Sequence, residues 1–215
     1  MEATSSTKRA QPAGRRYRSP LRDRQAADTR AAVIAAAGRL FVAGGWAGTG
    51  MRDVAAAAGV AIETVYAHFS SKRGLLQAVV DVAVVGDDRP VALASRPEFA
   101  ALGRGRRAAR ARAAARMLTG IYERTAPFAK VLQEAAASDE EIAEMLRVNR
   151  ERQRLDVAAA IELVVGRAPT AVERDGCWAI TSPEVYLLLV EESGWTPDQY
   201  EEWMAEVLER VVPRT

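Results

Sequence analysis

Only one histidine, His68, and one cysteine, Cys177, occur among the 215 residues, which leaves little material for catalysis or metal binding. An internal disulfide and a zinc site built from several cysteines are both excluded. The glycine-rich run at residues 44–50 lacks the spacing and the following lysine of a phosphate-binding loop, and no Gly-x-Ser-x-Gly motif is present. We therefore expect no enzymatic activity and no cofactor, and we expect Cys177 to be a small buried side chain rather than a redox sensor.

Basic side chains are concentrated at the start of the chain. The first 30 residues hold eight Lys and Arg against three acids, whereas the whole chain has a net charge of only +2. A basic segment ahead of a folded body suits a polyanion, and nucleic acid is the commonest polyanion in a cytoplasm. A solubilising disordered tail explains the same composition equally well.

Residues 51–72 describe two short helices packed across a tight turn. Val54, Val65 and Phe69 supply part of a shared core, and Gly59 can adopt the left-handed conformation that ends the first helix. The second helix then keeps its outer face free. In a helix-turn-helix this face enters the major groove of DNA, while the first helix crosses the phosphate backbone.

This segment resembles the DNA-binding region of the TetR family of bacterial transcriptional regulators. The resemblance covers about residues 29–83, and it rests on Leu40-Phe41, Gly45-Trp46, Thr49, Val54-Ala55, Ala58-Gly59-Val60, Tyr66, His68-Phe69, Lys72 and Leu75-Leu76. The sequence departs from the family at Gly50, where many relatives have a capping threonine. It departs again at Ala61, Ile62 and Glu63, which replace a commoner Ser-Lys-Gly and remove a basic phosphate contact.

The resemblance implies phosphate contacts from Tyr66, His68 and Lys72, whose phenol, imidazole and ammonium groups can all donate hydrogen bonds. For His68 the alternative is a capping or packing role, and for Lys72 it is simple solvation. Arg52, at the start of the first of the two helices, is a further candidate for DNA contact that could equally pair with an acid.

The same resemblance places Ile62, Glu63, Thr64 and Ala67 near base edges. Glu63 could accept a hydrogen bond from cytosine N4, and Ile62 could touch a thymine methyl group. A carboxylate at this position also favours the positive N-terminus of its own helix, and we consider this the better explanation of Glu63.

The pattern along the chain predicts an all-α fold. Val33, Ile34 and Phe41 share one helical face, Asp28 or Thr29 can cap the start of that helix, and glycines follow it. Four helices fit before residue 86, the first three forming the helix-turn-helix domain. The domains we expect are a disordered basic arm at 1–27, a helix-turn-helix DNA-binding domain at 28–86, a linker or irregular connection at 87–103, and a helical ligand-binding and dimerisation domain at 104–215.

Three helix starts in the C-terminal part carry the capping-box pattern. The pairs are Ser138 with Glu141, Thr170 with Glu173, and Thr196 with Gln199. An acid-free arginine run also lies there, and we expect a solvated helix face rather than a second DNA contact. Its members are Arg104, Arg106, Arg107, Arg110, Arg112 and Arg116.

The resemblance implies that the C-terminal domain senses a small molecule. Apolar and aromatic side chains typically line such pockets. The candidates are Met117, Ile121, Tyr122, Phe128, Leu132 and Trp178. Ordinary core packing explains each of them individually, so we expect only some to line a cavity.

Amphipathic stripes on the last two helical segments predict a homodimer. One stripe includes Tyr200, Trp203 and Met204, and the preceding segment carries Leu188. The combined expectation is a cytoplasmic repressor, without a membrane segment, that leaves a palindromic double-stranded DNA operator when an apolar or amphipathic ligand binds. A transcriptional activator with the same DNA-binding domain is an alternative. A helical interaction protein is another, but it leaves the basic arm and the helix-turn-helix unexplained.

Overall fold

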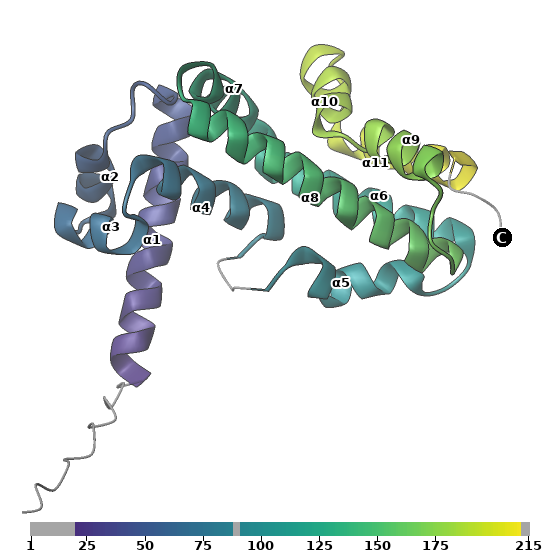
Figure 1. The fold of residues 1–215 in the computed structure, drawn as a ribbon, viewed down its shortest axis with the longest axis horizontal. Coiled ribbons are helices and arrows are strands. Elements are labelled where there is room, and N and C mark those ends of the chain that lie inside the picture. Colours follow the sequence, from purple (N-terminus) through teal and green to yellow (C-terminus); the bar gives the residue numbers. More distant parts are fainter. Residues whose placement is uncertain (1–19, 88–90, 212–215) are drawn as a thin grey trace, which may run out of the picture.

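The computed structural model describes residues 20–87 and 91–211, which form helices and no strand (Figure 1). The N-terminal elements are α1 (Pro20–Gly44), α2 (Met51–Ala58), α3 (Ile62–Phe69) and α4 (Lys72–Val85). Short turns follow as η1 (Leu93–Ser95), α5 (Pro97–Ala100) and η2 (Ala101–Gly103). The C-terminal elements are α6 (Arg107–Thr125), η3 (Ala126–Phe128), α7 (Ala129–Ser138), α8 (Glu140–Val165), α9 (Ala171–Ile180), α10 (Pro183–Tyr186), η4 (Leu187–Glu192, a π-helix) and α11 (Pro197–Val211).

Helix α1 begins two turns earlier than the apolar pattern predicts. Residues 20–27 were expected to belong to a disordered arm, but they are helical, and residues 1–19 lie outside the described part of the chain. Good helix formers such as Leu21, Arg22 and Arg24 follow a proline at the first helical position. Because Leu21, Arg22 and Arg24 are exposed, this extension buries no apolar face and gives no periodic signal.

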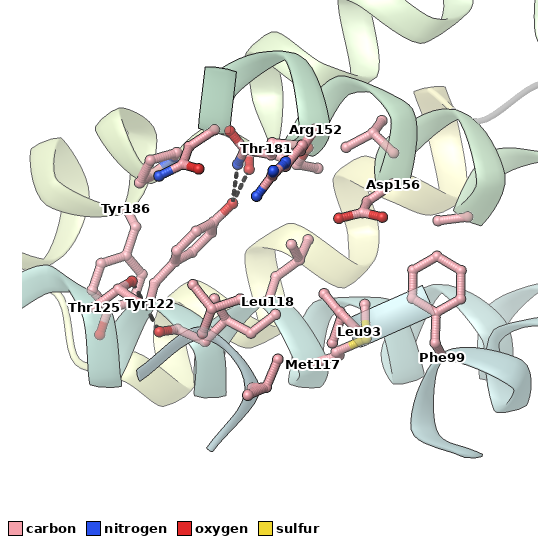
Figure 2. A pocket seen from close by; sticks show the side chains of 18 of the residues that line it. Leu93, Phe99, Met117, Leu118, Tyr122, Thr125, Arg152, Asp156, Thr181 and Tyr186 are labelled. Atoms are coloured by element: carbon pink, nitrogen blue, oxygen red, sulfur yellow. Dashed lines mark hydrogen bonds between the residues drawn. The ribbon is translucent and has the colours of Figure 1, made fainter. Parts of the chain in front are cut away.

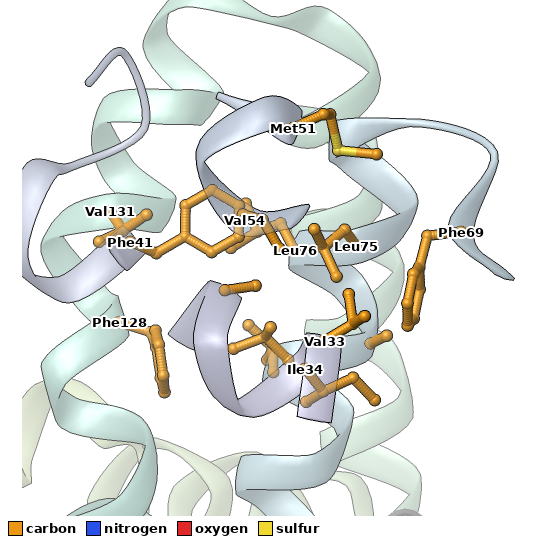
Figure 3. Packing of buried hydrophobic residues seen from close by; sticks show 14 of the residues in the cluster. Val33, Ile34, Phe41, Met51, Val54, Phe69, Leu75, Leu76, Phe128 and Val131 are labelled. Carbon is orange, nitrogen blue, oxygen red and sulfur yellow. The ribbon is translucent and has the colours of Figure 1, made fainter. Parts of the chain in front are cut away.

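A core joins the first four helices to α7 and α8. Val33, Phe41, Val65 and Leu75 are fully buried at its centre. Phe128, Val131, Ala135 and Ile142 from the C-terminal part belong to the same cluster (Figure 3). The expected boundary between the two domains is therefore crossed by continuous packing.

A second core lies among α6, α8, α9, α10 and α11. Tyr200, Met204 and Leu208 of α11 are buried here against α6. The expectation that Tyr200 and Met204 form a subunit interface is wrong, because these side chains are covered within one chain. The same helix leaves Val211 exposed and Trp203 partly exposed.

The described part of the expected linker, Asp87 and residues 91–103, contains short helical turns and several buried side chains. The guanidinium of Arg96, only 8% exposed as a residue, forms two hydrogen bonds to Asp87 at 2.8 and 2.9 Å. Phe99 and Leu102 of the same segment are also buried. The segment is thus held by an ion pair and an apolar anchor.

Two of the three predicted capping boxes are confirmed. Glu173 accepts a hydrogen bond from the N–H of Thr170 at 2.8 Å, and the pair Thr196 and Gln199 has the same reciprocal pattern. The prediction for Ser138 is wrong. Asp139 is the N-cap of α8, while the Ser138 hydroxyl bonds back to carbonyls of α7.

Two members of the arginine run lie at helix ends rather than on a merely solvated face. Arg107 donates to the carbonyl of Glu209 in the last turns of α11, and Arg110 donates to the carbonyl of Val164 in the last turn of α8. Cationic donors at a helix C-terminus satisfy free carbonyls and complement the helix dipole. These two arginines therefore have structural roles.

Candidate DNA-binding surface and ligand cavity

The turn between α2 and α3 fixes the direction of the second helix. Gly59 has φ 69° and ends α2, and its N–H bonds to the carbonyl of Ala56, while the N–H of Val60 bonds to the carbonyl of Ala55. A side chain at this φ is strained, which explains the glycine. Val65 and Phe69 then bury the inner side of α3.

The outer side of α3 carries most of the residues predicted to contact DNA. Glu63, Tyr66 and Ala67 are exposed, with Tyr66 at 48%, and Thr64 and His68 are partly exposed. Figure 1 shows α2 and α3 on one flank of α1, away from the C-terminal helices. This face is therefore open to a large partner.

Two of the predicted residues have further neighbours. Ile62 packs partly against the first core, so only part of its side chain is available to a base. Arg52 is exposed on α2, and among the described residues it has no ion-pair partner. The alternative that Arg52 pairs with an acid of the described chain is thus not supported.

Lys72 is engaged within the protein. Its ammonium donates to the carbonyl of Trp46 and lies 4.2 Å from the centre of the indole ring. Burial lowers the pKa of Lys72, and the nearby Glu134 acts in the opposite direction. The side chain therefore fixes the turn between α1 and α2, a contact that the sequence did not reveal.

Glu134 of α7 holds the same turn. Its carboxylate accepts the N–H of Trp46 at 3.1 Å and the N–H of Ala47 at 3.3 Å. Gly45 has φ 68°, and a Cβ there would lie 2.6 Å from a Glu134 oxygen, so the close approach requires glycine. Sequence reasoning missed Glu134 because it is 88 residues from its partner and carries no local pattern.

A cavity of about 780 Å³ opens in the C-terminal part of the molecule. Its walls come from α4, the 91–102 segment, α6, α7, α8 and the start of α10, and Figure 2 shows part of this lining. The volume lies within the range of drug-sized binding sites, roughly 300–1,000 Å³. The lining is mainly apolar, with Leu93, Phe99, Met117 and Leu118 prominent in the close view.

Four of the six predicted cavity residues line this space: Met117, Ile121, Tyr122 and Leu132. The other two, Phe128 and Trp178, do not. Phe128 belongs to the first core and packs against Gly38 of α1. Trp178 stacks with Arg154, whose guanidinium carbon lies 5.1 Å from the centre of the indole ring. Leu93, Phe99, Asp156 and Tyr186 line the cavity without having been predicted.

Polar groups occupy one end of the cavity. The Tyr122 hydroxyl donates to the carbonyl of Thr181 and accepts a hydrogen bond from Gln153 at 3.4 Å. Burial raises the pKa of Tyr122 well above its usual value, so the phenol stays protonated. Tyr186 packs beside it, with ring centres 5.6 Å apart.

Cys177 also borders the cavity. It is buried, and burial raises the pKa of its thiol, which disfavours the reactive thiolate. Within residues 20–87 and 91–211 no cluster of His, Cys, Asp and Glu is placed to hold a metal ion. No helix in the described part of the chain has the length and apolar character needed to cross a membrane.

Comparison with known families decides the nature of the N-terminal part. Residues 33–79, from the middle of α1 into α4, match the sequence model of bacterial regulatory proteins of the tetR family. This is a TetR-type DNA-binding domain. No curated protein sequence matches the chain significantly.

Solved structures of TetR-family regulators share the fold of most of this chain. The multidrug binding protein EbrR, solved with imidazole, has a TM-score of 0.58 and 22% identity over 87% of this chain and 92% of its own. A TetR-family regulator from Streptomyces coelicolor has a TM-score of 0.51 and 16% identity, over 93% of this chain and 99% of its own. NalD, the secondary repressor of the MexAB-OprM multidrug efflux pump in Pseudomonas aeruginosa, has a TM-score of 0.54 and 17% identity, over 88% of this chain and 98% of its own.

Proposed function

We propose that the protein is a homodimeric transcriptional repressor that leaves a two-fold symmetric DNA operator when a small molecule binds its cavity. The TetR-type domain supplies the DNA-binding surface, and the C-terminal helices supply the sensor. EbrR is described as multidrug-binding and NalD as the repressor of an efflux pump. The first description supports a small-molecule ligand and the second supports repression, while the mainly apolar lining of the cavity favours an apolar or amphipathic ligand.

One observation carries this proposal: α4 belongs to both sites. Leu75 and Leu76, in its first half, are fully buried in the core beneath α3. Val80, Val82 and Val84, in its second half, line the cavity. A ligand that changes the position of α4 therefore acts directly on the support of the recognition helix.

Contacts at both ends of α4 provide a structural connection between the cavity and the DNA-binding surface. At its C-terminal end, Arg124 of α6 donates to the carbonyls of Ala83 at 2.8 Å and Val84 at 3.1 Å. At its N-terminal end, Arg73 pairs with Asp139 at 2.6 Å. A ligand shifts the equilibrium only if it binds the DNA-free arrangement more tightly than the DNA-bound one.

The exposed residues of the last helical segments support the dimer. Leu188 is 51% exposed and Val211 is 43% exposed, and Trp203 is only partly covered. A two-fold interface would pair this surface with its own copy. The interface we propose is therefore narrower than the sequence stripes indicate, since Tyr200 and Met204 are already buried.

Selection from a random duplex library tests the proposal. The full chain should enrich two inverted half-sites whose centres lie about 34 Å apart or a multiple of it, so that both recognition helices meet one face of the duplex. Enrichment of single, unpaired sites would contradict the symmetric operator. Transcription from a promoter that carries the selected site, with and without the protein, separates repression from activation.

Sedimentation tests the dimer separately. Leu188→Glu should shift the protein to a folded monomer, whereas Leu155→Glu should leave it dimeric, although Leu155 on α8 is exposed at 68%. A wild-type monomer at micromolar concentration would contradict the dimer. If only Leu155→Glu produced a monomer, the dimer interface would lie on α8 instead.

A further inference from the structure

The charged side chains around the cavity are unequally satisfied. Among the described residues, 20–87 and 91–211, eight charged side chains line the cavity, and six of these have a partner within the protein. The partnered ones are Asp87 with Arg96, Arg150 with Glu184, Asp81 with Gln77, Arg107 with the carbonyl of Glu209, and Arg30 above the ring of Phe69. Two remain, Arg152 and Asp156, one turn apart on α8.

Asp156 is the more deeply placed of the two. It is partly buried, and within residues 20–87 and 91–211 no hydrogen bond or ion pair reaches its carboxylate. Figure 2 shows the carboxylate pointing into the cavity on the side of Leu93 and Phe99. Burial raises the pKa of Asp156 and no neighbouring charge opposes this shift, which agrees with an unpartnered group.

Arg152, by contrast, is exposed. As a residue it is more exposed than Asp156, so its charge loses less hydration and has less need of a partner from a ligand. An unpaired, half-buried carboxylate is costly because it has lost hydration without gaining a counter-charge. The cavity therefore favours a ligand that brings a positive charge to Asp156 more than one that brings a negative charge to Arg152.

The apolar walls define the rest of the ligand. Phe99, Tyr122 and Tyr186 add aromatic rings, and the faces of such rings attract cations when water is excluded. We propose that the cavity binds a lipophilic cation whose charged centre lies beside Asp156. This inference rests on the proposed function of the cavity as the sensor site.

Two ions of nearly the same shape and opposite charge test the inference. Tetraphenylphosphonium and tetraphenylborate are titrated into the full chain by calorimetry in sodium buffer, with triphenylphosphine oxide as a neutral comparator. Tetraphenylphosphonium should bind at least tenfold more tightly than either. Equal affinity for all three, or preference for the borate, would overturn the inference.

Variants assign the effect to the carboxylate. Asp156→Asn should weaken tetraphenylphosphonium binding at least tenfold, whereas Asp156→Glu should retain it within a few fold. Arg152→Gln, which removes the other unpartnered charge, should not weaken it. Thermal melting without ligand verifies the folding of each variant, and cation binding that is unchanged in a folded Asp156→Asn protein would overturn the inference.

The affinity for the selected operator, measured in the same samples, separates this inference from the proposed function. If tetraphenylphosphonium binds through Asp156 but leaves the DNA affinity unchanged, the cation site is supported and the sensor function fails. If only the borate or the neutral compound binds and releases DNA, the sensor function is supported and the cation inference is overturned.

Discussion

The carboxylate of Glu134 accepts the backbone N–H of Trp46 at 3.1 Å, and this contact ties α7 to the turn that precedes the helix-turn-helix. Lys72 holds the other side of the same turn through the Trp46 carbonyl. The turn is thus fixed from α7 and from the start of α4. Since α4 and α7 residues also line the cavity, both attachments lead from the sensor to the DNA-binding surface.

Replacing Glu134 with alanine should loosen this connection. Two backbone N–H groups lose their acceptor, and because the site is exposed we expect the free energy of unfolding to fall by about 1 kcal/mol. Urea denaturation measures this loss, with Lys130→Ala, an exposed residue one turn earlier on α7, as the control. Ligand should also change the DNA affinity less in Glu134→Ala than in the wild type. Full coupling in a destabilised variant would contradict a role for Glu134 in transmission.

The basic residues that precede α1 should contribute to DNA affinity through phosphate contacts. Residues 1–19 contain Lys8, Arg9, Arg15, Arg16 and Arg18. Each contact contributes about 0.9 to the slope of log affinity against log salt concentration, so removal of all five should reduce the slope by up to about 4.5. Truncation at residue 19 is the suitable variant because it leaves α1 whole. An unchanged slope would identify the segment as a solubilising tail.

Thr64 and Tyr66 should affect DNA binding in different ways. Thr64→Ala should change the preferred base at one position of each half-site, whereas Tyr66→Phe should weaken binding to all sequences similarly, because base contacts specify and phosphate contacts position. Selection followed by affinity measurement on single-base variants of the operator distinguishes the two effects. If both variants changed the base preference to the same extent, the proposed orientation of α3 would be wrong.

The helix-turn-helix could be predicted from the sequence because its determinants are local. Gly59, Val65 and Phe69 lie within eleven residues of one another, and each restricts the backbone or the core in a recognisable way. Contacts between distant segments give no such pattern. The bond from Glu134 to Trp46 and the position of Asp156 in the cavity both depend on how α7 and α8 pack against the rest of the chain.

Periodicity also failed to show what covers an apolar face. The stripe on α11 correctly predicts that Tyr200 and Met204 are buried, but α6 covers them rather than a second subunit. Phe128 is likewise buried, yet in the first core and not in the cavity. A hydrophobic pattern identifies a face that leaves water, and only the packing of the elements identifies its neighbour.

Acid should weaken the cap of α9. The hydrogen bond from Arg167, together with the N–H of Thr170, lowers the pKa of Glu173 from 4.5 to about 2. Because the folded-state pKa lies below the unfolded value, the stabilisation is complete above pH 4.5 and is lost as the pH falls toward 2. Glu173→Gln should therefore show a smaller drop in melting temperature between these pH values than the wild type. Glu202→Gln, an exposed change on α11, is the matched control, and parallel profiles for Glu173→Gln and the wild type would refute the assignment.

The most direct test of the account is the affinity of the full chain for its selected operator, compared at one salt concentration with a scrambled duplex of the same length and composition. A regulator that reads base edges through α3 should bind the operator at least about 10³-fold more tightly than the scrambled duplex. A ratio near one would mean that the protein binds DNA only through its charge, and this result would contradict the central claim.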